Sequence, residues 1–312
     1  GAVKKAAATV PTTNTPNDTN ATNQADESTA APTKGDVQVT NLKTADDATY
    51  EAAKQTADEA YKTTGVAQEI VRMDDAVAYP IRDGGVLTPN ADFVINTTPT
   101  GTDIGDGTFG TSNWSLSQKG VLTIGSGELG SGPATSVHAN SGENTWSEKI
   151  SNWAIYQGDI KSIQIDKGVI APVDASYLFA GLPLVYEIDG LENLDTSKTQ
   201  DFTGMFEEDN GLLSLDTSKM DTSSATSMSL MFSMDNYLPN LDLSHWDVSK
   251  VTNFTSMFWY TRISSLDLSN WNTASATQYA QMFDHMGNLY QITFGPNFTI
   301  KPEMPTVELI DE

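Results

Sequence analysis

The sequence contains no cysteine, so disulfide bonds, zinc sites built on thiolates and a cysteine nucleophile are all excluded. The lack of cysteine fits an exported bacterial protein that does not depend on oxidative folding, although cytosolic proteins can lack cysteine too. No apolar run approaches the roughly 18 residues that a membrane-spanning helix needs. We therefore expect no insertion into a membrane.

Basic residues are scarce as well. The 312 residues include 17 Lys and Arg against 41 Asp and Glu, which gives a formal net charge of -24. A chain this acidic is repelled by nucleic-acid phosphates and by anionic lipid surfaces, so neither is an expected partner. Hydrophobic residues make up 38% of the chain, which is low for globular domains and predicts that part of it never packs. None of these features decides the oligomeric state.

Familiar catalytic motifs are missing. The three histidines, His138, His245 and His285, lie far apart and match no metal-ligand spacing, and no phosphate loop, G-x-S-x-G elbow or H-E-x-x-H motif occurs. Paired carboxylates for glycoside hydrolysis stay open in so acidic a chain, but no pair stands out. We predict that the protein is not an enzyme and has no cofactor.

Composition divides the chain into five predicted segments. Residues 1–43 are rich in Ala, Thr, Asn and Pro and contain no aromatic residue, which predicts a disordered spacer because they cannot bury enough surface to fold. Residues 44–78 predict a helical segment, with Thr44 as its N-cap and Gly65 past its first helix. The other segments are a β-rich capping region (79–182), the repeats (183–299) and a C-terminal tail (300–312).

The capping region is predicted from alternating apolar residues. The stretch NWSLSQKGVLTIGSGEL (113–129) holds two alternating runs joined by a polar turn with Gly120, which is typical of a β-hairpin. A second stretch, IKSIQIDKGVI (160–170), predicts another strand followed by a turn.

Four segments that end in Met-Phe repeat in phase along the second half of the chain. Their methionines are separated by 26, 26 and 25 residues. A strand-like stretch such as LPNLDLS or ISSLDLS precedes the later copies, and LYQITF follows the last one. A period of about 20–29 residues with a strand and a helical piece in each repeat predicts an α/β fold, a short leucine-rich-repeat solenoid. The four segments are 194–206, 220–232, 246–258 and 271–283.

Most positions of the repeat predict core packing. In LDLSHWDVSKVTNFTSMF (241–258), Leu241 and Leu243 point inward as on a strand, whereas Asp242 points outward. The predicted helical piece places its large apolar residues on one face, which stacked copies bury together. Its members in this copy are Val251, Phe254, Met257 and Phe258, and the repeat also assigns Trp246 and Trp271 to the core.

The outward aspartates form a column, Asp189, Asp216, Asp242 and Asp267. Neighbours about 4.8 Å apart repel each other by about 1 kcal/mol in water, or roughly 3 kcal/mol at an effective dielectric near 20. Backbone N–H donors or solvent, a basic ligand, or a cation such as calcium can offset this repulsion. A single column supplies few of the 6–8 oxygens that calcium takes, so a metal is the weakest of these three. The second column, Asp195, Asp221, Asp247 and Asn272, sits at a turn and predicts a backbone-capping role.

One copy departs from the others just after Met-Phe. Where the others continue with polar turns, the third copy reads Trp259-Tyr260-Thr261-Arg262. Aromatic residues beside an arginine are typical of protein and glycan recognition, unless Trp259 folds back onto the neighbouring turn. The candidate ligand-binding residues are Trp259, Tyr260, Arg262, Asp216, Asp242 and Asp267.

The pattern at 241–258, seen again at 266–283, resembles the BspA-like leucine-rich repeats of bacterial surface proteins, found notably in lactobacilli and other Gram-positive bacteria. The likeness covers roughly residues 110–295. It implies an extracellular protein on the cell surface or wall, an adhesin that binds host mucin, matrix proteins, glycans or epithelial components through many weak contacts. The alternatives are a passive stalk that displays another domain and a carbohydrate-active enzyme in the 79–182 region.

Overall fold

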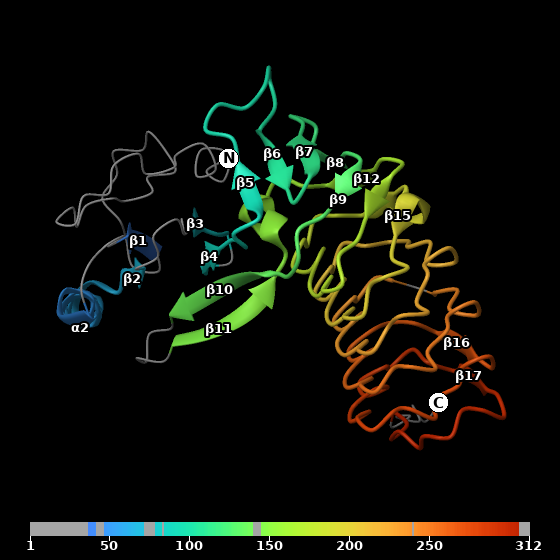
Figure 1. Ribbon diagram of the computed structural model, residues 1–312. Helices are drawn as coiled ribbons and strands as arrows, with labels where there is room; N and C mark the ends of the chain where they lie inside the picture. The colour runs from blue at the N-terminus through green and yellow to red at the C-terminus, as the bar shows by residue number, and fades with distance from the viewer. Residues whose placement is uncertain are drawn as a thin grey trace, which may run out of the picture.

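The computed structural model describes residues 37–41, 47–71, 79–82, 84–139, 145–238 and 240–305. It begins with two parallel strands, β1 (Val37–Asn41) and β2 (Ala67–Val71), on either side of the helix α2 (Asp47–Thr64). A set of β-sheets follows, and a regular stack of turns forms the second half of the chain (Figure 1). Among the described residues no helix is long and apolar enough to cross a membrane.

Helix α2 is Ala-rich and buries a narrow stripe. Ala57 is buried, with Tyr50 and Ala53 packed against it. The other faces are exposed and carry an ion pair between Lys62 and Glu59, as the low content of large apolar residues predicts. The helix ends at Thr64, and the next residue, Gly65, has a φ of +66°, a left-handed conformation that glycine adopts without strain. The predicted N-cap, Thr44, lies outside the described residues.

A six-stranded sheet has the order β14-β12-β8-β7-β6-β5. It is antiparallel from β5 to β8 and parallel from β8 through β12 to β14, so it changes from hairpins to crossovers as the repeats begin. Its strands are β5 (Phe93–Ile95), β6 (Gly105–Phe109), β7 (Ser112–Leu116), β8 (Val121–Ile124), β12 (Ser162–Ile165) and β14 (Glu187–Asp189).

Two smaller sheets flank the first. One has the order β11-β10-β4-β3, and its hairpin β10–β11 projects beside the stack of turns (Figure 1). The other is parallel, with the order β15-β13-β9. Their strands are β3 (Tyr79–Pro80), β4 (Val86–Thr88), β9 (Gly127–Glu128), β10 (Ala134–Ala139), β11 (Thr145–Ile150), β13 (Val169–Ile170) and β15 (Leu194–Asp195). Two 3-10 helices, η1 (Asn152–Tyr156) and η2 (Leu191–Asn193), connect them.

An aromatic cluster joins the sheets to the repeats. The ring of Trp153 in η1 is fully buried and meets Phe93 and Phe109 edge-on, with centroids 5.8 and 5.6 Å away. On its other side it stacks on Phe179, the first ring of the repeat stack. The core is therefore continuous from the sheets into the repeats.

The repeats stack through parallel backbone contacts. Isolated parallel bridges link Asp174, Asp201, Ser227, Asn253 and Gln278, each one repeat further along. Beyond each bridge, every second N–H donates to a carbonyl of the next repeat, as from Leu230 to Thr255, Phe232 to Met257 and Met234 to Trp259. The intervening N–H groups donate three residues back within their own repeat, so this part of the backbone is paired without a helix.

The predicted leucine-rich-repeat solenoid, with a strand and a short helix in each repeat, is wrong. The one α-helix of the described residues is α2, which precedes the repeats, and apart from the short 3-10 helices η1 and η2 the remaining regular structure is β-sheet with no repeating strand-plus-helix unit. The cause lies in two columns of left-handed residues at each turn, because a positive φ interrupts the succession of right-handed residues that an α-helix needs. These columns are Tyr177, Gly204, Leu230, Ser256 and Gln281, and then Gly181, Glu208, Met234, Tyr260 and His285.

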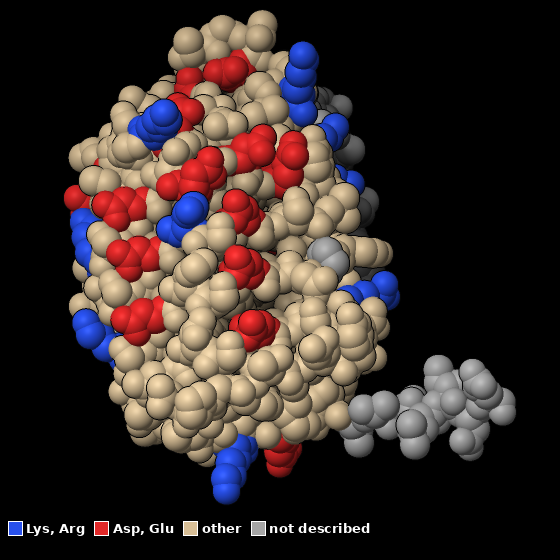
Figure 2. Space-filling view, turned by 90° about the vertical axis from the view of Figure 1, so that its right-hand side faces the viewer, with Lys and Arg blue, Asp and Glu red and all other residues tan. Residues whose placement is uncertain are grey.

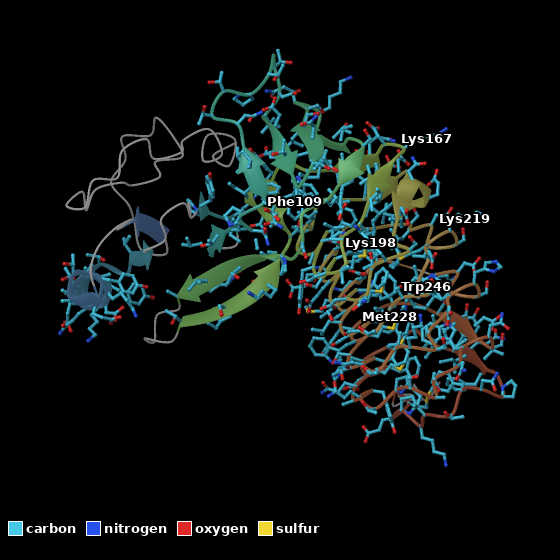
Figure 3. The ribbon with its side chains drawn as sticks, viewed as in Figure 1. Phe109, Lys167, Lys198, Lys219, Met228 and Trp246 are labelled. Atoms are coloured by element: carbon cyan, nitrogen blue, oxygen red, sulfur yellow. The ribbon has the colours of Figure 1, made fainter. Side chains whose placement is uncertain are left out.

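Phenylalanine rings run through the centre of the stack. Phe206, Phe232 and Phe258 stack face to face, with centroids 5.8 Å apart at both steps. The core positions expected from the repeat are buried, including both tryptophans, whose indole N–H groups donate to Thr217 O and Leu243 O. Figure 3 shows Met228 and Trp246 within the stack and Lys167 and Lys219 at its outer edge.

The stack ends with a short parallel pair, β16 (Ser265–Leu268) and β17 (Gln291–Phe294). The chain then passes beneath the last repeat, where Thr273 N–H donates to Asn297 O. Side chains here are more exposed than in earlier repeats: Phe294 is exposed, whereas Leu268 opposite it is buried. The last repeat is therefore covered less completely than the earlier ones.

Candidate functional site

The departure from the repeat at Trp259 and Tyr260 forms an aromatic cluster on the edge of the stack. Tyr260 has a φ of +57°, and its N–H donates to Asp284 O in the next repeat. Its ring stacks on His285, with centroids 4.3 Å apart and planes 17° apart. Trp259 meets the Tyr260 ring edge-on at 4.5 Å. The turn therefore holds three aromatic rings together at the surface.

Exposure differs among these rings. Tyr260 is 42% exposed and His285 is also exposed, whereas Trp259 is half-buried and its indole nitrogen has no hydrogen-bond partner. Trp259 therefore serves partly as the support of the cluster, and Tyr260 presents the accessible face. The imidazole Nδ1 of His285 lies 3.1 Å from an oxygen of the Asp284 carboxyl group, which fixes the orientation of the ring.

Arg262 contacts a different ring. Its guanidinium carbon lies 5.6 Å from the centroid of Tyr237, which is 58% exposed, in the geometry of a cation–π contact. The edge of the stack thus combines exposed aromatic faces with a guanidinium group. We name Trp259, Tyr260, Arg262, Tyr237 and His285 the aromatic edge.

The sequence interpretation missed Tyr237 and His285. His285 occupies the same column as Tyr260, 25 residues further on, so the repeat alignment contained the signal. Tyr237 precedes Arg262 by the same 25 residues. Each of these pairs therefore lies on adjacent repeats, as one period of a stacked array requires.

The candidate residues Asp216, Asp242 and Asp267 lie on another part of the stack. All three are exposed, and the Oδ1 atom of each accepts a hydrogen bond from the backbone N–H two residues further on, at 3.0 to 3.1 Å. Serine hydroxyls add bonds of 2.6 Å to Asp216 and Asp242. Figure 2 shows acidic side chains one above another on this molecule's surface.

These hydrogen bonds stabilise the charged form of each carboxylate. The Ser244 hydroxyl, then its N–H, hold the pKa of Asp242 below its usual value, and Ser218 does the same for Asp216. Hydrogen bonds from backbone N–H groups, one of the three expected ways to offset the repulsion between the aspartates, are therefore present. Within the described ranges no group of three or more His, Asp or Glu side chains is placed to hold a metal ion.

A separate cavity of about 380 Å³ lies between strand β11 and the first turns of the stack. Three acids line it, Glu148 from β11 and Glu207 and Glu208 from the stack, together with Lys149 and Tyr177. Glu148 is held in place by His138, whose Nε2 lies 2.8 Å from its Oε1. The cavity was not anticipated because its residues lie far apart in the sequence.

Glu207 is the perturbed group of this cavity. Burial, followed by the negative charges of Glu208 and Glu148, raises its pKa to about 8. Burial and the neighbouring Glu207 also raise the pKa of Tyr177 to about 12. At neutral pH Glu207 is thus a protonated acid near carboxylates, an arrangement that can donate a proton or a hydrogen bond to a ligand.

Comparisons with known proteins found a family model that matches the repeats and a weak similarity to a solved structure. A family model described as "Mycoplasma protein of unknown function, DUF285" matches residues 173–293. Curated proteins gave no match. A leucine-rich repeat protein from Eubacterium ventriosum is similar in structure at 15% identity with a TM-score of 0.27, covering 60% of this chain. The chain spans 42% of that protein, and so weak a likeness assigns neither fold nor function.

Proposed function

We propose that this protein is an extracellular recognition module of the adhesin type, which binds host mucin, matrix protein or glycan through the aromatic edge. The observation that supports it is the exposed stack of Tyr260 on His285 beside the Arg262–Tyr237 contact. Stacked rings present a rigid apolar face at little entropic cost, and the guanidinium adds directed hydrogen bonds. The resemblance to BspA-like surface proteins of lactobacillus-type bacteria points to the same function.

The stack suits such a role because its backbone is fixed from one repeat to the next. The N–H of Tyr260 is bonded to the following repeat, and that of Trp259 is bonded within its own turn, so binding orders little further structure. Affinity for one site of this size is modest. Many copies on one cell surface raise the overall avidity without new contacts.

The proposal is tested by binding the whole chain to arrays of mucins, matrix proteins and glycans. We expect binding to at least one component, and Tyr260→Ala to weaken it roughly tenfold or more. Tyr186→Ala is the matched control, because Tyr186 is an equally exposed tyrosine of the stack outside the aromatic edge. Equal loss in both variants, or binding to no component, contradicts the proposal, and absence of binding supports a passive stalk.

The acidic cavity favours a second candidate, a carbohydrate-active enzyme. A carboxylic acid with a raised pKa close to a carboxylate is what glycoside hydrolysis uses, and Glu207 beside Glu148 has these properties. Release of reducing sugar from a glycan by the chain, abolished in Glu207→Gln, would support the enzyme. Unchanged glycans would exclude it.

A further inference from the structure

Two buried carboxyl groups lie in the core of the stack and belong neither to the cavity lining nor to the aromatic edge. Asp209 is 1% exposed and Asp235 is 0% exposed, and they occupy the same column of successive repeats. The backbone N–H of Leu182 donates to Asp209 Oδ1 at 3.0 Å, and the N–H of Asp209 donates to Asp235 Oδ1 at 3.1 Å. The Oδ2 atom of each is buried and has no hydrogen-bond partner.

This setting does not suit a pair of carboxylates. A buried charge needs an opposite charge or several donors, and each group here receives one N–H bond. The acidic neighbours that act on Asp209 are Glu208 and Glu207 of the same turn, and those that act on Asp235 are Asp209 and Glu207. Glu148 and Lys149 of β11 face the cavity that Glu207 and Glu208 line.

Protonated carboxyl groups fit this site better. A neutral carboxyl keeps its Oδ1 atom as the acceptor of the observed N–H bond and removes the charge that burial penalises. Burial raises the pKa of both aspartates well above the usual value, against the opposing effect of the single N–H bond on each. The hydrogen bonds and the burial therefore both favour the neutral form of the two carboxyl groups at neutral pH.

We propose that Asp209 and Asp235 act as a proton-holding pair, which makes the folded stack most stable in acid and progressively less stable as the pH rises. The unfolded chain releases these protons near pH 4, the ordinary range of aspartate. The folded chain retains them, so it binds more protons than the unfolded chain above that pH. Each retained proton then lowers the folding equilibrium constant about tenfold for every pH unit of increase.

Other acids act in the opposite direction. Asp216 and Asp242 have lowered pKa values, so their stabilisation is present above the usual pKa of aspartate and is lost as the pH falls below it. Both are exposed, which weakens their effect. The two classes also act in different pH ranges, so the region from about pH 5 to 8 reports the groups with raised pKa values, which are the buried pair and Glu207.

The test is chemical unfolding of the whole chain between pH 5 and pH 8. We expect the folding equilibrium constant of the wild type to fall as the pH rises. In the double variant Asp209→Asn/Asp235→Asn, this fall should be up to about 100-fold smaller per pH unit. The matched control is Asp216→Asn/Asp242→Asn, which removes two exposed acids of the same stack and should keep the wild-type slope. Parallel slopes for wild type and the buried-pair variant would overturn the proposal.

Asparagine leaves an extra amide at each buried site, so the double variant can fail to fold. A second measurement leaves both aspartates in place: the infrared band of protonated carboxyl groups in Glu207→Gln at pH 7. That background removes the other acid that is protonated at this pH. We expect the band to be present in the folded state and absent after unfolding. A folded protein without this band would also overturn the proposal.

Discussion

The imidazole ring of His285 stacks on the phenol ring of Tyr260, although the two residues belong to successive repeats. Both have a positive φ, at 55° and 57°, because they share one left-handed column of the turns. The contact therefore arises from the stacking of repeats and not from neighbouring positions in the sequence. It turns two single aromatic residues into one surface.

We predict that His285→Ala weakens ligand binding by roughly tenfold, because Tyr260 loses the ring that fixes its orientation. His285→Phe should retain most of the binding, since a phenyl ring can stack in the same place. The affinity of each variant for the ligand found on the array measures this. Equal losses in the alanine and phenylalanine variants would instead assign the effect to the imidazole nitrogens.

The left-handed columns yield a prediction about stability. Gln281 is exposed and has a φ of +57°, which costs a non-glycine residue about 1 kcal/mol. Gln281→Gly should therefore raise the free energy of unfolding by up to about 1 kcal/mol. Urea unfolding at constant pH measures the change.

Gly204 provides the reverse substitution in the same column. Its φ is +59°, and an added Cβ would lie 2.4 Å from the Tyr177 ring. Gly204→Ala should lower the free energy of unfolding by at least about 1–2 kcal/mol. If both substitutions change the free energy of unfolding in the same direction, the left-handed backbone conformation does not determine stability at this column.

The phenylalanine ladder is expected to hold the repeats together. Phe232 is fully buried between Phe206 and Phe258. Phe232→Ala should lower the free energy of unfolding by about 3–5 kcal/mol, because it leaves a cavity and breaks two ring contacts. Phe232→Leu should cost less than half as much. A loss below about 1 kcal/mol in the alanine variant would show that the repeats unfold independently.

The sequence predicts burial in the repeats better than it predicts backbone conformation. The core positions Phe254, Met257 and Phe258 follow from the period, because stacking requires every repeat to bury the same positions. The helix was wrongly predicted because the left-handed residues Leu230 and Ser256 are not glycines, so nothing in the sequence signals their positive φ. Hydrogen bonds between repeats hold these turns, and local propensity does not report them.

The candidate site was predictable in part for a related reason. Tyr260 and Arg262 stand out because they break the repeat, whereas His285 matters only through its stacking on Tyr260. Asp209 and Asp235 lie in turns that read as solvated, EEDNG and SMDNY, so their burial is invisible in the sequence. Only the alignment, which places them in one column, gives any sign of their contact.

The exposed aspartates are predicted to stabilise their own turns and to bind no calcium. Asp242→Ala removes the acceptor for the Ser244 N–H and should cost about 0.5–1 kcal/mol, whereas Asp242→Asn keeps that acceptor and should cost little. Adding calcium should leave the melting temperature unchanged, since one oxygen of each carboxylate is already used. A calcium-dependent rise in melting temperature that disappears in Asp242→Ala would show a metal site.

Glu207 is predicted to make the stability of the protein depend on pH between about pH 4 and pH 8. Its pKa is raised to about 8, so the folded protein holds a proton that the unfolded chain releases above roughly pH 4. Its contribution therefore favours folding most in acid. As the pH rises, the free energy of unfolding falls by on the order of 1 kcal/mol per pH unit until the pH passes about 8. Glu207→Gln should remove this slope and raise stability at pH 8. The carboxyl carbon resonance of Glu207, followed by NMR, should titrate near pH 8, and a midpoint near pH 4 would show that the side chain is solvated.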